Sequence, residues 1–218
     1  MQMEQAIRDL VGETDTYLAR FEGAGVSDVR AGIARWRNGP VRPISGRRLP
    51  VLGLIDQAVR CLADSGEGPL ANAIERAVPY LPWITYPGYE RDAIGTRFAD
   101  NHAHASFMGE EGLIKAGDYD LGLFVIAPNT LYRDHKHAAP ELYAPLTGPH
   151  GWRFAPGAPF TWKAAHDPVW NEPFQPHAIK VGDVPFLCIF GWPRDIRCIS
   201  RVVSAPDWDV IERTQPSR

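Results

Sequence analysis

The fold of this chain is constrained most by one histidine-rich stretch near its middle. Residues 129–143 read NTLYRDHKHAAPELY and contain His135, His137, Glu141 and Tyr143. Side chains two residues apart in a strand point to the same face, so the two histidines are predicted to share one face of a strand. The proline before Glu141 cannot donate to a sheet hydrogen bond and interrupts that strand. Glu141 and Tyr143 are then predicted to share one face of a second strand.

These side chains could meet inside one β-barrel and form a metal site. Neutral imidazole combined with carboxylate is a ligand mixture of Zn²⁺, Fe²⁺ and Mn²⁺ sites. A third imidazole is expected from a neighbouring strand, and His177 supplies it in the segment FQPHAIKVGD. A His-x-His pair alone is more simply a solvated pair, but the added Glu and Tyr favour a mononuclear site for one divalent ion. His102 and His104 also have ligand spacing, yet no Glu follows them in matching register, so we do not expect them at the site.

Length and charge limit the class of protein. At 218 residues the chain can form one large domain, or a domain with an added subdomain. A formal net charge of -3 argues against a nucleic-acid-binding protein that relies on phosphate contacts. No apolar run approaches the roughly 18 residues of a membrane span, and the first residues lack the pattern of a signal peptide. We therefore expect a soluble cytoplasmic protein without nucleic-acid or membrane partners.

The spacing of apolar residues changes along the chain. Residues 1–80 carry apolar residues at helical intervals, as in Ile7, Leu10 and later positions, and are predicted to be helical. Residues 81–94 are aromatic and broken by prolines, which predicts a connector. Residues 95–210 contain many short apolar segments separated by turn residues, which is typical of a β-sandwich or small barrel. The helical stripes are expected either to cover the barrel or to form a homodimer contact.

With His135, His137, Glu141, Tyr143 and His177 placed on strands, the chain resembles a cupin. Cupins are double-stranded β-helix barrels whose first motif supplies His-x-His and a Glu, and whose second motif supplies another His. The resemblance implies a mainly β fold, with the N-terminal helical region packed on the barrel.

Two departures from the general cupin pattern indicate one branch of these proteins. A Tyr follows the Glu of the first motif, and Tyr-Arg-Asp, beginning at Tyr132, replaces the usual glycine before the first His. Together with Trp192 and the helical N-terminal region, these features are similar to the cupin-type dimethylsulfoniopropionate (DMSP) lyases, particularly the Q-type branch. The similarity covers most of the chain and is strongest over residues 119–193.

This resemblance implies roles for residues at matching positions. His137, Glu141 and His177 take the metal-ligand positions, Tyr143 either binds the metal or acts as the base, and His135 lies beside the site. A metal beside Tyr143 would lower a phenol pKa that is ordinarily about 10.

The remaining implied roles concern the substrate. Tyr132 lies on the pocket wall and Trp192 lines the pocket, and both are expected to hold the sulfonium by cation–π contact. Tyr143, Tyr132 and His135 are the implied catalytic residues, with Tyr132 the next candidate base after Tyr143.

The implied reaction is β-elimination of DMSP to acrylate, dimethyl sulfide and a proton. Two alternatives stay open on the residues alone. The same ligands occur in cupin dioxygenases and isomerases acting on other small acids, and in cupins that only bind a small molecule.

Overall fold

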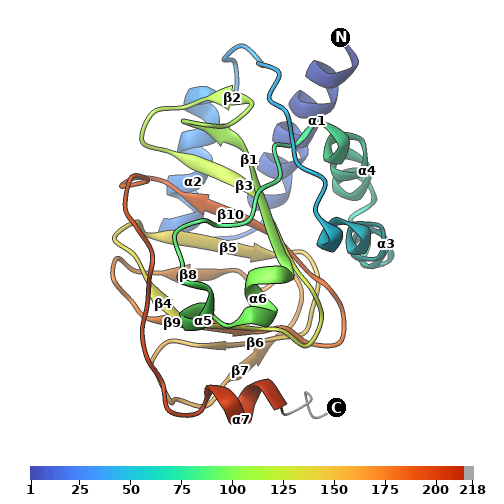
Figure 1. The fold of residues 1–218 in the computed structure, drawn as a ribbon. Helices are drawn as coiled ribbons and strands as arrows, with labels where there is room; N and C mark the ends of the chain where they lie inside the picture. Colours follow the sequence, from blue (N-terminus) through green and yellow to red (C-terminus); the bar gives the residue numbers. More distant parts are fainter. Residues whose placement is uncertain (214–218) are drawn as a thin grey trace.

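The computed structural model describes residues 1–213, apart from the side chain of Ala24, as helices packed on two β-sheets (Figure 1). The helices are α1 (Gln2–Leu18), α2 (Ala24–Trp36), η1 (Pro50–Leu54), α3 (Ile55–Asp64), α4 (Gly68–Ala77), η2 (Val78–Tyr80), α5 (Arg91–Ile94), α6 (Thr96–Asp100) and α7 (Trp208–Arg213). The strands are β1 (His102–Gly109), β2 (Ile114–Lys115), β3 (Asp120–Ile126), β4 (Leu131–Lys136), β5 (Glu141–Pro145), β6 (His150–Arg153), β7 (Thr161–Lys163), β8 (Val169–Asn171), β9 (His177–Lys180), β10 (Phe186–Trp192) and β11 (Arg201–Val202).

The strands form two sheets, and the chain crosses between them repeatedly. One sheet has six strands in the order β2-β1-β3-β10-β5-β8, and the other has five in the order β11-β4-β9-β6-β7. From β3 to β6 and from β7 to β11, consecutive strands lie in different sheets, whereas β1, β2 and β3 share the six-stranded sheet and β6 and β7 share the five-stranded one. Apart from the parallel pair β1–β2, the paired strands run antiparallel. This arrangement is the double-stranded β-helix of a cupin with an N-terminal helical region, and it confirms the predicted fold class.

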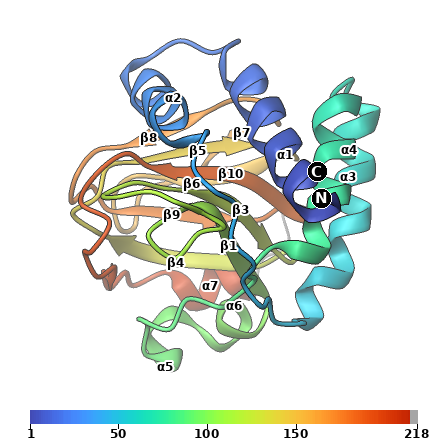
Figure 2. The same ribbon diagram turned by 90° about the horizontal axis from the view of Figure 1, so that it is seen from above.

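Period-two alternation in the central strands generates two separate hydrophobic cores. In β3, Leu121, Leu123 and Val125 face an outer core shared with α1–α4, whereas Phe124 and Ile126 face an inner core between the sheets. Figure 2 shows these helices lying over the six-stranded sheet. The apolar stripes of the helical region are thus buried within one chain. Burying one such Leu or Phe contributes about 1.5–3 kcal/mol.

Helix α2 approaches the sheet closely because small residues lie at its contact points. A Cβ added to Gly32 would lie 1.9 Å from Cε2 of Tyr119, and one added to Gly25 would lie 2.1 Å from Cε3 of Trp170. The Tyr119 hydroxyl donates a hydrogen bond to the carbonyl of Val29, 2.8 Å away. The glycines therefore allow the aromatic rings of Tyr119 and Trp170 to pack directly against the helix backbone.

A buried ion pair fixes the strand that carries the first histidine. Arg153 of β6 donates to Asp134 of β4 over 3.0 Å and to Asp207, at the start of α7, over 2.7 Å. Trp208 also donates its indole N–H to Asp134. Asp134 therefore points away from His135 and joins β4, β6 and the C-terminal helix.

Replacing Gly32 with alanine should destabilise the protein by about 2 kcal/mol, measured as the urea-unfolding free energy. The new methyl group collides with the buried Tyr119 ring, and such overpacking outweighs the roughly 1 kcal/mol gained in helix propensity. The matched control is Gly53→Ala, because nothing lies within 4 Å of that Cβ position. Equal stabilities for the two variants would contradict the close packing of α2.

Candidate metal centre

The site begins with an irregularity in the pairing of β4 with β9. Tyr132 pairs with Ile179 and His135 pairs with His177, so three steps along β4 match two steps along β9. An extra residue of this kind is a β-bulge, and it reverses the direction in which the later side chains of the strand point. Residues three apart normally point to opposite faces, but here Tyr132 and His135 both face inward, with ring centroids 3.9 Å apart.

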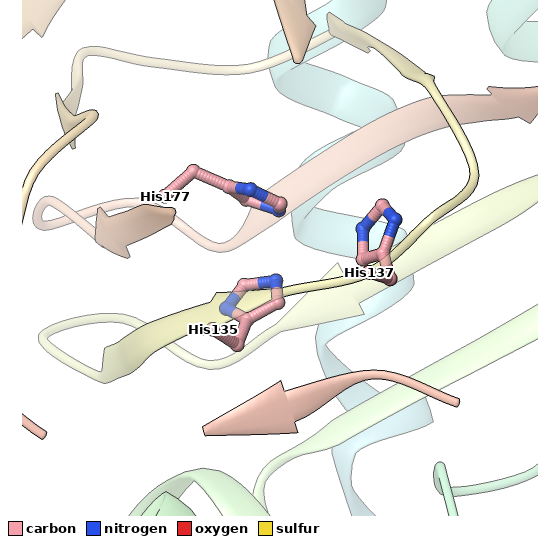
Figure 3. A group of neighbouring side chains, drawn as sticks. All are labelled: His135, His137 and His177. Atoms are coloured by element: carbon pink, nitrogen blue, oxygen red, sulfur yellow. The ribbon is translucent and has the colours of Figure 1, made fainter. Parts of the chain in front are cut away.

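Three imidazoles converge from two strands and the segment after them. His135 and His177 are direct cross-strand partners with ring centroids 4.1 Å apart. His137 lies just beyond the end of β4, where the chain turns toward β5, rather than within the strand as its spacing predicted. All three are buried, and one ring nitrogen from each lies within 4.8 Å of the others. Figure 3 shows the three side chains around one common space.

Backbone carbonyls fix which ring nitrogen carries the proton. The Nδ1 atoms of His135, His137 and His177 lie 2.8, 2.7 and 3.0 Å from the carbonyl oxygens of Arg133, Ala139 and Gln175. A carbonyl can only accept, so each Nδ1 carries the hydrogen and each Nε2 is left with a lone pair in the neutral ring. In the described part of the chain, the Nε2 atoms of His135 and His177 are buried without a hydrogen-bond partner. These are the free donor atoms that a metal ion requires, held by the carbonyl contacts typical of metal-binding histidines.

Glu141 completes the centre with a carboxylate. Its Oε2 lies 3.1 Å from Nε2 of His137 and 3.5 Å from Nε2 of His177. With neutral rings these are contacts between acceptors, so only a proton or a metal cation can stabilise them. Burial by itself would raise the pKa of Glu141, but when the facing nitrogens of His137 and His177 carry protons, their hydrogen bonds and charge outweigh burial and the pKa is lowered. The donor set fits one divalent metal ion.

The centre opens into a cavity of about 180 Å³ between the sheets. Tyr143 follows Glu141 on the inward face of β5, as predicted, and lines this cavity. Tyr132 and Trp192 also line it, and the Trp192 ring lies 4.5 Å from that of His137. The cavity is thus lined by five of the residues that the sequence predicted for the site, namely Tyr132, His137, Glu141, Tyr143 and Trp192. The other two, His135 and His177, join His137 in the imidazole cluster.

Tyr132 is held by rings on both of its faces. Its centroid lies 4.0 Å from that of Phe98 on one side and 3.9 Å from that of His135 on the other, with nearly parallel planes. Phe98 in turn stacks on His102 at 4.1 Å. The four rings form a column, so a ligand can reach the edge and hydroxyl of Tyr132 and not its face. That hydroxyl lies 2.8 Å from the hydroxyl of Tyr89.

Several cavity residues were missed by the sequence prediction. His102 and His104 line the cavity, contrary to expectation, and burial lowers the pKa of each to about 4, so both are neutral at pH 7. Tyr86 and Tyr89 come from the segment predicted to be only a connector, whose pair of tyrosines was the available signal. Asp120, the first residue of β3, gave no local signal at all.

Across residues 1–213, the structure contains no helix long and apolar enough to cross a membrane.

The sequence is similar to known lyases over most of its length. The profile of the dimethylsulfoniopropionate lyase family matches residues 34–188. The DMSP lyase DddQ of Ruegeria pomeroyi is 26% identical over 171 residues, which cover 78% of this chain and 82% of the relative. The putative DMSP lyase DddL of Cereibacter sphaeroides is 29% identical over 128 residues, covering 56% of this chain and 50% of the relative.

Solved structures share the fold. The crystal structure of DMSP lyase DddQ from Ruegeria pomeroyi matches with a TM-score of 0.71 at 22% identity, covering 91% of this chain and 96% of that one. A chain from the crystal structures of the DMSP lyases RdDddP and RnDddQII gives a TM-score of 0.72 at 20% identity, covering 92% and 98%. At these identities the structural matches show a common fold.

The imidazole cluster predicts the metal content of purified protein. After dialysis against zinc and removal of excess ion, elemental analysis should find one ion per wild-type chain and almost none in a His137→Ala, His177→Ala double variant. The variant loses two of three imidazole donors. The control is His166→Ala, which removes a histidine bound to Tyr17 and Ser65 outside the cavity and should keep the ion. Equal zinc in the wild type and the folded double variant would rule the centre out.

Proposed function

The chain belongs to the dimethylsulfoniopropionate lyase family, and on that premise we propose that it is a metal-dependent carbon–sulfur lyase acting on DMSP. In the reaction, a proton leaves the carbon next to the carboxylate, the bond from the β-carbon to sulfur breaks, and a carbon–carbon double bond forms. The products are acrylate, dimethyl sulfide and a proton, so atoms and charge balance.

The observation that carries this proposal is the set of buried lone pairs beside a small cavity. Within residues 1–213, the Nε2 atoms of His135 and His177 have no hydrogen-bond partner, and Glu141 supplies a carboxylate. The cavity of about 180 Å³ suits a small substrate, since a cavity of roughly 150 Å³ can hold a benzene-sized molecule. A large substrate would not fit beside the metal centre.

We propose that His137, Glu141 and His177 hold the metal, with His135 and Tyr143 at or beside it. The ligand types suit Zn²⁺, Fe²⁺ or Mn²⁺. A divalent ion bound there supplies positive charge that acidifies the α-proton of a carboxylate substrate and stabilises the enolate-like transition state.

Tyr143 is the proposed base. Burial, together with the nearby Glu141 carboxylate, raises its pKa well above 10, so the residue is a phenol in the chain alone. A cation close to the phenol oxygen favours the phenolate and lowers that pKa. Its position two residues after Glu141, on the same face of β5, puts it beside the proposed ligands. Tyr132, whose hydroxyl is bound to that of Tyr89, is the second candidate.

The substrate is proposed to lie between the metal centre and the aromatic wall. The indole of Trp192 can contact the sulfonium through its face. Because Phe98 and His135 cover both faces of Tyr132, this tyrosine contributes its edge and hydroxyl.

We also propose a division of the chain by role. Residues 1–80 form a helical region that supports the outer face of the six-stranded sheet, residues 81–94 form a connector, and residues 95–210 form the barrel. Tyr86 and Tyr89 support a further role for the connector, because both line the cavity.

The direct test is to mix metal-loaded protein with DMSP and measure both products. Elimination predicts equal amounts of dimethyl sulfide in the headspace and acrylate in solution. Dimethyl sulfide without acrylate would indicate another cleavage reaction, and the absence of both would contradict the proposal.

Substituting Tyr143 with phenylalanine separates catalysis from metal binding. The variant keeps the ring packing and loses the hydroxyl, so kcat should fall by roughly 100-fold or more while the metal content stays near that of the wild type. Glu141→Ala should instead lose metal and activity together. A Tyr143→Phe protein that releases dimethyl sulfide at nearly the wild-type rate would remove Tyr143 as the base and leave Tyr132 as the candidate.

A further inference from the structure

One carboxylate in the cavity has no role in the proposed elimination. Asp120 begins β3 and shares the inward face of that strand with Phe124, four residues later. Its direct cross-strand partner in β10 is Trp192. Side chains of such antiparallel partners lie about 5 Å apart, so Asp120 lies beside the indole on the wall of the cavity.

The carboxylate of Asp120 lacks a positive partner. Within residues 1–213, its Oδ1 is buried without a hydrogen-bond partner, and no Lys or Arg forms an ion pair with it. Burial raises its pKa to about 7, hydrogen bonding to Ser106 and to the Leu121 backbone only partly opposes this, and the Glu141 carboxylate raises it further. A buried carboxylate of this kind is costly unless something positive pairs with it.

We propose that Asp120 binds the positively charged end of the substrate, so that the cavity selects a small zwitterion with its carboxylate at the metal centre and its onium group between Asp120 and Trp192. This inference rests on the proposed function, because it assigns the binding of one end of the same substrate.

The order of side chains along the cavity supports this assignment. His137 belongs to the metal centre, the Trp192 ring lies 4.5 Å from it, and Asp120 pairs with Trp192 across the sheet. A short zwitterion lying along this line has its negative end at the metal and its positive end at a carboxylate. The reverse orientation would place two carboxylates together, so the charges also fix the direction of binding.

His104 and Trp192, which line the cavity together with Asp120, carry no charge, so Asp120 itself is the charged group that recognises a cation. His104, on the adjacent strand, is neutral at pH 7 because burial lowers its pKa to about 4. The face of an indole attracts a cation by its quadrupole but does so for any cation of suitable size. A desolvated carboxylate attracts a cationic ligand group by its charge, whereas a neutral ligand group of the same shape is not attracted in this way. Asp120 therefore distinguishes an onium ion from its uncharged counterpart.

The test compares two unreactive carboxylates that differ in charge at the far end. The probes are 3-(trimethylammonio)propionate, which is cationic there, and 4,4-dimethylpentanoate, which has the same shape and is neutral there. Calorimetric titration of metal-loaded wild-type protein should give at least tenfold tighter binding of the cationic probe. Asp120→Asn keeps the shape and removes the charge, so it should weaken binding of the cationic probe by roughly 30-fold and change the affinity for 4,4-dimethylpentanoate less than twofold.

The matched control is Asp183→Asn, which removes an exposed carboxylate in the turn before β10 and should leave both affinities unchanged. Binding of 4,4-dimethylpentanoate by Asp120→Asn shows that its cavity is intact, and Asp120→Ser provides the same comparison if the asparagine variant does not fold. A wild type that binds both probes equally, or an Asp120 variant that keeps the cationic preference, would overturn the inference.

These measurements need no turnover, so they separate the two proposals. A protein that releases no dimethyl sulfide yet loses its cationic preference in Asp120→Asn would disprove the proposed reaction and support the binding role. A protein that releases dimethyl sulfide but whose Asp120→Asn variant keeps the cationic preference would support the proposed reaction and disprove the binding role of Asp120.

Discussion

The structure depends on a group of buried polar atoms that only a cation can bring together. Three imidazoles direct unprotonated nitrogens toward a common space, because their other nitrogens donate to backbone carbonyls. The Glu141 carboxylate lies against two of them. Unpaired polar groups in a protein interior cost several kcal/mol in total, and acceptors facing acceptors cost more. The surrounding fold must therefore hold this arrangement rigidly. A bound metal ion would pair with these atoms and so increase the free energy of unfolding.

The rest of the architecture supplies that rigidity. The bulge in β4 turns Tyr132 and His135 to the same side, and the pairing of β4 with β9 places His135 against His177. The buried Arg153–Asp134 ion pair fastens the outer side of β4, while the helices fill the space behind the six-stranded sheet. Each device acts on a strand that carries a ligand or a cavity residue. The helical region thus serves the site without contributing a side chain to it.

The sequence predicted those parts of the site that depend on local spacing. His-x-His, the Glu after the proline and the Tyr two residues later all arise from period-two geometry, and the cupin fold followed from them by resemblance. The features that could not be predicted depend on long-range register. The bulge in β4 adds one residue where the sequence shows no glycine or proline. The end of β4 before His137 is likewise set by pairing with distant strands. Asp120, His104 and Tyr89 reach the cavity only because strands and loops distant in sequence meet there, so no spacing within their own segments could reveal them.

The central claim is that one metal ion, held by the imidazole cluster, enables cleavage in this cavity. The most direct measurement is to strip the purified protein with a chelator, return a single divalent ion in steps, and record dimethyl sulfide release from DMSP at each step. Negligible release is expected from the stripped protein, then a linear rise that ends at one ion per chain. Undiminished release from fully stripped protein, or a rise that continues well beyond one ion per chain, would contradict the claim.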